Sequence, residues 1–523
     1  MKILSKTDLM RNQICPTKLA LDKQENPLKD RSKDESLHSG VLSHYRREGG
    51  YQIEDIAEQM FEGIQKSTLF GVKGLLETQS LVFGKVPAVS QASAQSSGNY
   101  ARADILAKMP QKEVNLELRN YMRENYRSSY GGYHALYEVK STTTVKKDHI
   151  VDLAFQTHVF ESSAYKIGKT FVITVKKDFE RTDQEINPSH ILEITDVTDR
   201  VLNELPNLKE KINSAHSTLN QSEIPSSTIY KQCNHNKADT ICPHIAYCPN
   251  WSNLDAEKTP IFYLPFLSQK KQDQYAEDNI MYIEDIDPGD KKLTKTQTPV
   301  VLAHKQDQPL IKLDKIQEFL DQVDTNLPIS FLDFETFTKV IPEIGHKPYQ
   351  LIPILSSTGI LYPTNHLVRH DFIETSMPSN SRFFAESLIR NIDSIGSIFS
   401  WYMQFEKSVI KQLIHMNPDL DGELNSICDR MLDLRDPFSK GYYVDRGFEG
   451  TTKLKKVGHI LTQDLSYNGL EVDNGSMVGD HWYEMINSDD IHKKNTIITN
   501  LQKYCSLDTT SLVRIYQFLK DLT

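Results

Sequence analysis

The stretch Leu136-Tyr137-Glu138-Val139-Lys140-Ser141 decides how the rest of this chain is interpreted. Its apolar residues predict a short β-strand, in which alternate side chains share one face of a sheet. Glu138 and Lys140 therefore project together, while Tyr137 and Val139 point the other way. Opposite charges side by side on an apolar strand are unusual in a core, but they are typical of a site that binds a divalent cation and an anionic ligand.

Two neighbouring segments extend this site. Asp104 lies in the run Ala103-Asp104-Ile105-Leu106, which predicts another short strand. Residues 148–160 predict an amphipathic helix, on which Asp152 and Gln156 lie one turn apart on the same face. Carboxylates bind Mg²⁺ or Mn²⁺ through oxygen, and a lysine can neutralise charge that builds on a phosphate. An isolated Glu-x-Lys would be an ordinary surface ion pair, but these neighbours favour a metal site.

The segments around Asp104, Glu138 and Gln156 resemble the PD-(D/E)XK nuclease superfamily. They are Ala-Arg-Ala-Asp-Ile-Leu-Ala-Lys, Leu-Tyr-Glu-Val-Lys-Ser-Thr-Thr and Asp-Leu-Ala-Phe-Gln-Thr-His-Val-Phe. They are most similar to the RecB-like branch, which includes the CRISPR-adaptation exonucleases and the AddB nuclease domain. The resemblance implies that Asp104 and Glu138 are metal ligands, that Lys140 is the catalytic lysine and that Gln156 positions the substrate.

The sequence departs from this branch at two places. Phe160 stands where the branch has a tyrosine after the glutamine. The upstream helix, where the branch often carries a histidine, has Glu54 and Glu58 but no histidine. The upstream ligand therefore has no assignment from the sequence.

Four of the six cysteines lie near the two ends of the first predicted domain: Cys15, Cys233, Cys242 and Cys248. Four thiolates can close a tetrahedral Zn²⁺ site or hold an iron–sulfur cluster, and His235 and His244 keep zinc open. In the RecB-like branch, one cysteine before the nuclease core and three after it bind a [4Fe-4S] cluster. The resemblance therefore implies a [4Fe-4S] cluster, with Zn²⁺ as the alternative. Cys428 and Cys505 lie in apolar stretches and are predicted core residues.

A second acidic pattern begins at Phe331-Leu332-Asp333-Phe334-Glu335-Thr336, which predicts a strand with Asp333 and Glu335 on one face. Two like charges at this separation repel each other unless a cation lies between them. Two later helical segments place Glu406 and Asp508 on otherwise apolar stripes, where a carboxylate is costly unless it is paired or bound to metal. The three segments together predict a second metal site.

The second set, with Tyr504 four residues before Asp508, resembles the DEDD exonucleases of the RNase H-like fold. The resemblance implies that Asp333, Glu335, Glu406 and Asp508 bind two metal ions and that Tyr504 orients the attacking water. The third acid of that family is usually aspartate, so Glu406 is a departure. Four further motifs resemble a bacterial domain of unknown function that commonly follows a RecB-like nuclease: Lys-Pro-Tyr-Gln (347–350), Asp-Leu-Arg-Asp-Pro-Phe (433–438), Leu-Lys-Lys-Val (454–457) and Tyr-Cys-Ser-Leu-Asp-Thr (504–509).

The length of 523 residues predicts two to four domains. We expect an α/β protein with an N-terminal PD-(D/E)XK restriction-endonuclease-like domain over residues 1–252. A partly helical connecting region follows over 253–327, and an RNase H-like domain covers 328–523. Within the first domain, the Ser-, Gln- and Gly-rich run 91–98 predicts a turn.

Net charge and hydropathy limit the partners and the location that the sequence allows. The net charge of -10 is weak evidence against a nucleic-acid partner, because many nucleases concentrate positive charge in one channel. No apolar run approaches the length of a membrane helix, and the N-terminus lacks the apolar core of a secretory signal. We therefore expect a cytoplasmic protein with no membrane partner.

The combined patterns predict a nuclease that uses Mg²⁺ or Mn²⁺ to hydrolyse phosphodiester bonds of DNA, from ends or on single strands. Two alternatives stay open at this point. One is a nucleic-acid-binding or assembly protein whose second domain is inactive. The other is an exonuclease that processes RNA, because DEDD folds serve RNA as readily as DNA.

Overall fold

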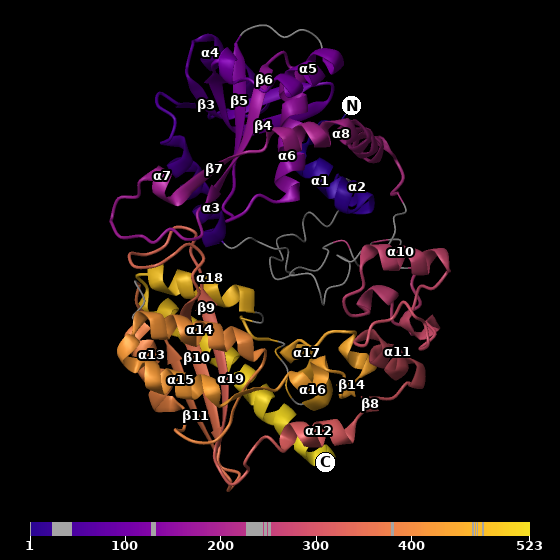
Figure 1. The fold of residues 1–523 in the computed structure, drawn as a ribbon, viewed down its shortest axis with the longest axis vertical. Coiled ribbons are helices and arrows are strands. Elements are labelled where there is room, and N and C mark those ends of the chain that lie inside the picture. Colours follow the sequence, from indigo (N-terminus) through magenta and orange to yellow (C-terminus); the bar gives the residue numbers. More distant parts are fainter. Residues whose placement is uncertain are drawn as a thin grey trace. The chain divides into compact units, whose positions relative to one another are not determined.

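The computed structural model describes residues 2–23, 44–126, 132–225, 244, 248, 253–377, 381–462, 465, 467, 469–472 and 475–523. Helices and mixed β-sheets make up this part of the chain (Figure 1), which confirms the α/β class. Packing divides the chain into two compact units. Unit 1 contains Met1–Thr228, Pro243–Ser252 and Lys339–Gln350, and unit 2 contains Ile229–Cys242, Asn253–Thr338 and Leu351–Thr523. The whole of the predicted connecting region, residues 253–327, thus belongs to unit 2.

Unit 1 is built on a seven-stranded sheet of order β2-β3-β4-β5-β6-β7, with β1 paired to β4. Strands β3, β4 and β5 are antiparallel neighbours, whereas β5 and β6 are parallel. A parallel pair needs a crossover connection, and helix α6 supplies it. The strands are β1 (Leu4–Ser5), β2 (Gln65–Lys66), β3 (Ala88–Ser96), β4 (Asn99–Met109), β5 (Tyr133–Val139), β6 (Lys166–Val175) and β7 (Leu192–Asp196). The α-helices are α1 (Lys6–Ile14), α2 (Pro16–Lys23), α3 (His44–Glu58), α4 (Gly71–Phe83), α5 (Leu116–Asn125), α6 (Lys147–Ser162), α7 (Pro188–Ile191) and α8 (Thr198–Asn220).

Strand β5 alternates as its sequence predicts. Leu136 belongs to an apolar cluster with residues of α1, α6 and α8, whereas Val139 belongs to a second cluster on the opposite face of the sheet. The Tyr137 ring packs against that second cluster and stacks on Phe171 with 4.7 Å between ring centroids. Because successive side chains point to opposite faces, Glu138 is directed to the face that α6 covers.

The turn predicted at 91–98 is wrong for most of its length. Residues Ala88–Ser96 form strand β3, and only Ser97 and Gly98 turn the chain into β4. The polar composition misled the prediction because the side chains are small rather than exposed. Ala92 and Ala94 are buried, and their size lets helix α6 pack closely on this strand.

Unit 2 is built on a five-stranded sheet of order β11-β10-β9-β12-β13. Strand β9 is antiparallel to β10 and parallel to β12. The strands are β9 (Ile329–Phe337), β10 (Ile352–Leu361), β11 (Leu367–Ile373), β12 (Ile398–Ser400) and β13 (Met431–Asp433), with a separate pair of β8 (Leu310–Ile311) and β14 (Tyr443–Val444). The α-helices are α10 (Gln269–Glu277), α11 (Gln297–Gln306), α12 (Leu313–Leu320), α13 (Ser381–Asn391), α14 (Met403–Met416), α15 (Asp421–Asp429), α16 (Asp436–Ser439), α17 (Leu454–Thr462), α18 (Gly475–Asn487) and α19 (Ile491–Leu522).

The two faces of β9 are covered by different helices. Leu332 and Phe334 pack with residues of α13, α14 and α15, whereas Phe331 packs with residues of α19. Alternation along the strand therefore places Asp333 and Glu335 on the face that α19 covers. None of the helices within the described ranges has an apolar stretch able to cross a lipid bilayer.

Two candidate metal centres

We call the first group of charged residues the first centre: Lys6, Asp104, Glu138, Lys140, Asp152 and Gln156. Its members come from four elements of unit 1 that meet at one end of β5. Asp104 lies on β4, Glu138 on β5 and Lys140 directly after β5. The remaining members lie on α1 and α6. The structure thus brings together every residue that the sequence assigned to this centre.

The predicted pairs of the first centre are in direct contact. Gln156 donates through Nε2 to Glu138 Oε2 at 2.6 Å and to Asp152 Oδ1 at 2.9 Å. Lys140 forms an ion pair with Glu138, and its Nζ lies 3.3 Å from Asp152 Oδ2. Asp104 accepts the backbone N–H of Val139 at 2.7 Å, which fixes its carboxylate beside the end of β5.

Lys6 is a member that the sequence did not reveal. Its Nζ lies 2.9 Å from Glu138 Oε1 and 3.0 Å from Asp152 Oδ2. The position follows from the start of α1: strand β1 pairs with β4, and Ser5 caps the helix through a capping box with Asp8. No local spacing signals these contacts, because Glu138 lies 132 positions and Asp152 lies 146 positions after Lys6 in the sequence.

The charges of the first centre do not balance, since three carboxylates face two ammonium groups. Although burial opposes ionisation, Lys6 and Lys140 lower the pKa of Glu138 below its ordinary value. Burial and the Glu138 charge raise the pKa of Asp152 to about 6, and the same two causes raise that of Asp104 well above its ordinary value. Two of the three carboxylates therefore take up protons at a higher pH than free carboxyl groups do.

A divalent cation would suit the charge of this arrangement, but among the described residues only Asp333, Glu335 and Asp508 of unit 2 bring three such ligand atoms within 4.8 Å of one another. The cation would take the place of the protons on Asp104 and Asp152 and complete the charge balance. Gln156 Oε1 is buried without a hydrogen-bond partner, so an oxygen acceptor is also left over at this position. Carboxylate oxygens are the donors that Mg²⁺ and Mn²⁺ prefer.

Glu54 and Glu58, the two glutamates of the upstream helix, have different surroundings. Glu54 lies on α3, where burial and the charge of Glu138 raise its pKa. It also accepts a hydrogen bond from Gln91 Nε2 at 3.1 Å. Glu58 instead pairs with Lys66 at 3.1 Å. Phe160, at the position of the family tyrosine, is fully buried in the apolar cluster around α6.

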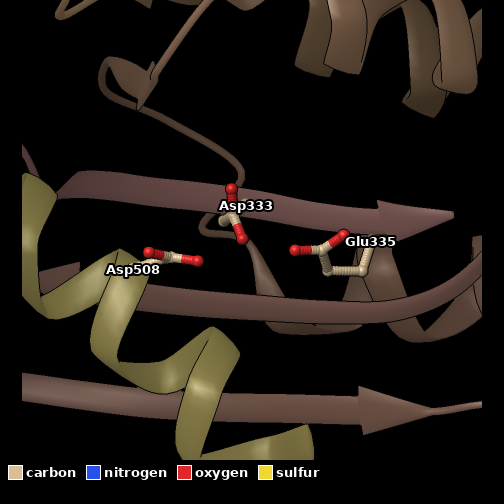
Figure 2. A group of neighbouring side chains, drawn as sticks. All are labelled: Asp333, Glu335 and Asp508. Carbon is tan, nitrogen blue, oxygen red and sulfur yellow. The ribbon is translucent and has the colours of Figure 1, made fainter. Parts of the chain in front are cut away.

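We call the second group the acidic trio: Asp333 and Glu335 on β9 and Asp508 on α19. Each contributes a carboxylate oxygen, and these oxygens all lie within 4.8 Å of one another. Figure 2 shows the three side chains turned toward a common space between the strand and the helix. Burial raises the pKa of Asp508 to about 6, and burial together with neighbouring carboxylates raises the pKa of Asp333 and Glu335 well above the ordinary range.

Glu406 and Tyr504 lie near the trio. Glu406, in the first turn of α14, is buried, and its Oε2 has no hydrogen-bond partner. Burial and the Asp333 charge raise the pKa of Glu406 to about 9, although its carboxylate lies outside the trio itself. Tyr504 is buried one helical turn before Asp508 and is hydrogen-bonded to it.

Four further residues surround the trio: Lys455, Tyr467, Gly475 and Cys505. Tyr467 donates to Asp508 Oδ1 at 2.5 Å, and Cys505 Sγ donates to Asp333 Oδ2 at 3.3 Å. The Lys455 ammonium lies 4.4 Å from the centre of the Tyr504 ring, and its charge lowers the pKa of Asp508 against the effect of burial. A Cβ at Gly475 would lie 3.4 Å from Glu335 Oε1. In the sequence, Lys455 lies in the motif Leu-Lys-Lys-Val (454–457), which resembles the domain of unknown function.

The predicted cysteine cluster falls mostly outside the described residues, because Cys233, Cys242 and His235 lie there. Cys15 and Cys248 are half-buried, and the backbone N–H of Lys18 donates to Cys15 Sγ at 3.4 Å. His244 contacts Asp22, with Nε2 2.5 Å from Oδ1. Cys428 and Cys505 are buried, which confirms their placement in the core.

A family described as a domain of unknown function (DUF2779) matches residues 330–453. This range contains Asp333, Glu335 and Glu406 and ends before Tyr504 and Asp508. No curated protein matches the chain.

Proposed function

We propose that this chain is a metal-dependent nuclease that hydrolyses phosphodiester bonds of DNA, from ends or on single strands, with one catalytic centre in each unit. The acidic trio is the observation on which the proposal depends most. Three carboxylates with oxygens within 4.8 Å of one another, one of them buried and two half-buried, repel one another strongly unless a cation lies between them. The first centre adds independent support, because it combines leftover negative charge with a lysine.

The order of elements supports two nuclease folds. In unit 1, three antiparallel strands are followed by α6 and the parallel strand β6, as expected of a PD-(D/E)XK core. In unit 2, the antiparallel strands β9, β10 and β11 are extended by β12 and β13 parallel to β9, as expected of an RNase H-like domain. In both units the acids lie on central strands and on a helix packed against them.

In the first centre, Asp104, Glu138 and Asp152 would hold Mg²⁺ or Mn²⁺. The bound cation supplies Lewis acidity, which polarises a phosphate and lowers the pKa of a water. Gln156 holds Glu138 and Asp152 in fixed positions through its amide. Lys140, which is partly exposed beside Glu138, is placed to neutralise charge on a phosphate oxygen.

In the second centre, the trio would hold the cation, and the orphaned Oε2 of Glu406 offers a further ligand atom. Tyr504 can contribute a hydroxyl proton, since burial and the charge of Asp508 raise its pKa well above the ordinary value. The phenol is therefore a hydrogen-bond donor at neutral pH, which suits a group that orients a water.

The test uses the full chain with Mg²⁺ or Mn²⁺ and end-labelled DNA and RNA, each single- and double-stranded. We expect cutting of DNA that stops when EDTA is added. Lys140→Ala and Asp333→Ala should each remove the part of the cutting that belongs to one centre, and the double variant should remove nearly all of it. Lys147→Ala and Asp489→Ala, which change exposed residues of the same types, are the matched controls.

Two results would refute the proposal. One is the absence of cutting on all four substrates with both cations. The other is a double variant that cuts at the wild-type rate. If only RNA were cut, the proposed substrate would be RNA rather than DNA. Cutting that Lys140→Ala removes completely and Asp333→Ala leaves intact would assign a binding role to unit 2.

A further inference from the structure

The segment Lys339–Gln350 lies between β9 and β10 in the sequence, yet it belongs to unit 1. It is a compact loop closed by its own contacts. The backbone N–H of Tyr349 donates to the carbonyl of Lys339 at 2.8 Å, and that of Lys347 donates to Gln350 Oε1 at 3.0 Å. Compact surface loops whose ends lie close together are frequently functional.

The segment is attached to unit 1 by apolar and polar contacts. Val340 and Ile341 pack on the apolar cluster that also contains Val139, at the end of β5. The backbone of Arg181 pairs with the segment on both sides: it accepts from Gly345 N–H at 2.7 Å and donates to the His346 carbonyl at 3.1 Å. The Arg181 guanidinium also donates to the Pro342 carbonyl at 3.0 Å. Such a set of contacts fixes the position of the loop.

Tyr349 connects this loop to the first centre. Its hydroxyl donates to the carbonyl oxygen of Ser141, the residue that follows Lys140. On the other side, the backbone N–H of Lys140 donates to the Ile173 carbonyl of β6 at 2.9 Å. The Thr142 carbonyl also accepts the backbone N–H of Val175 at 2.9 Å. The end of β5 is therefore held by the sheet on both sides of Ser141 and by Tyr349 at Ser141 itself, directly after Lys140. Tyr349 also has a φ of +59°, a conformation that a bulky residue adopts only when its surroundings impose it.

We propose that Lys339–Gln350 is a structural part of the first centre and that Tyr349 is a positioning residue for Lys140. The inference rests on the proposed nuclease activity of the first centre. It extends that proposal by making a centre of the N-terminal half depend on a hydroxyl from the C-terminal half. The motif Lys-Pro-Tyr-Gln (347–350), which no part of the proposed chemistry uses, acquires a role: it supplies the tyrosine and the local contacts that hold it.

The test compares Tyr349→Phe with the parent in the full chain, with Asp333→Ala present in both so that cutting by the second centre is silenced. Loss of one hydrogen bond should lower kcat by about fivefold to tenfold and leave KM within about twofold. Tyr51→Phe, the same change on an exposed ring of α3, should alter neither constant. Hydrogen–deuterium exchange over residues 136–146 should become about fivefold faster in Tyr349→Phe and stay unchanged in Tyr51→Phe.

Equal kcat and equal exchange in Tyr349→Phe and its parent would overturn the inference. A rise in KM alone, with unchanged exchange, would also overturn it, because the tyrosine would then bind substrate rather than position the strand. If the parent does not cut, the proposed activity of the first centre fails. In that case faster exchange in Tyr349→Phe would still establish the attachment of the loop, and unchanged exchange would exclude it.

Discussion

The substitution Glu406→Gln should stabilise unit 2 when no divalent cation is present. Burial and the Asp333 charge raise the pKa of Glu406 from 4.5 to about 9, so the folded state holds a proton that the unfolded state releases at neutral pH. A carboxyl group whose pKa is raised on folding does not lower the free energy of unfolding at a pH below the pKa it has in the unfolded state. The loss of stability grows as the pH rises toward the pKa in the folded state. Glutamine keeps the shape and removes this ionisation.

The magnitude follows from the two pKa values. One pKa unit corresponds to 1.36 kcal/mol, and at pH 7 the pH lies about 2.5 units above the unfolded value. The variant should therefore gain about 3 kcal/mol in the free energy of unfolding at pH 7, and less than about 1 kcal/mol at pH 5. With Mn²⁺ at 100 times its dissociation constant, the wild type should recover about 2.7 kcal/mol, and the variant less, because an amide is a poorer ligand.

Urea unfolding followed by tryptophan fluorescence provides the assay, because Trp401 and Trp482 both lie in unit 2. The experiment is run in EDTA at pH 5 and pH 7 and repeated with Mn²⁺. Glu423→Gln, on the exposed side of α15, is the matched control and should change nothing. A Glu406→Gln protein that is less stable than wild type in EDTA at pH 7, or whose gain is equal at both pH values, would refute the reasoning.

Three further predictions concern the metal centres. Mn²⁺ affinity at the trio, measured by calorimetry in an Asp104→Ala background, should fall by at least about tenfold per pH unit below pH 6. Asp508, with its pKa of about 6, takes up one competing proton there, and the raised pKa values of Asp333 and Glu335 add to the competition. An affinity that is constant from pH 7 to pH 5 would contradict this. Lys6→Met should slow cutting by the first centre about tenfold in an Asp333→Ala background, with Lys6→Arg in between, since the ion pairs to Glu138 and Asp152 are lost; equal rates for Lys6→Met and its parent would count against a role for Lys6. Anaerobic purification should give a protein with visible absorption and about four irons per chain, both lost in Cys15→Ser, whereas stoichiometric zinc without iron would replace the cluster by a zinc site.

Local rules account for what the sequence predicted correctly. The period of two along a strand put Glu138 beside Lys140 and Asp333 beside Glu335, and the structure has both pairs. The spacing of four along a helix put Gln156 beside Asp152, and the two side chains are hydrogen-bonded. These contacts depend on the geometry of single elements, which a sequence pattern reports directly.

The parts that could not be predicted depend on distant segments. Lys6 reaches the first centre only because β1 pairs with β4, and Tyr467 reaches Asp508 only through the tertiary packing around α19. Neither contact leaves a periodic signal. Strand β3 was missed for a different reason. Its alanines and serines resemble a turn in composition, although buried small side chains serve to admit a close helix.

The membership of Lys339–Gln350 in unit 1 has a consequence for how the protein is made. Helix α8 ends at Asn220, and about 120 residues must be synthesised after it before the first residue of this loop appears. At 5–20 residues per second, that interval is about 6 to 24 s. During this time the growing chain already contains Glu138 and Lys140 but lacks the tyrosine that holds the end of their strand. A nascent N-terminal half would therefore fold before its first centre is complete, and completion would coincide with translation of the strands that flank the loop.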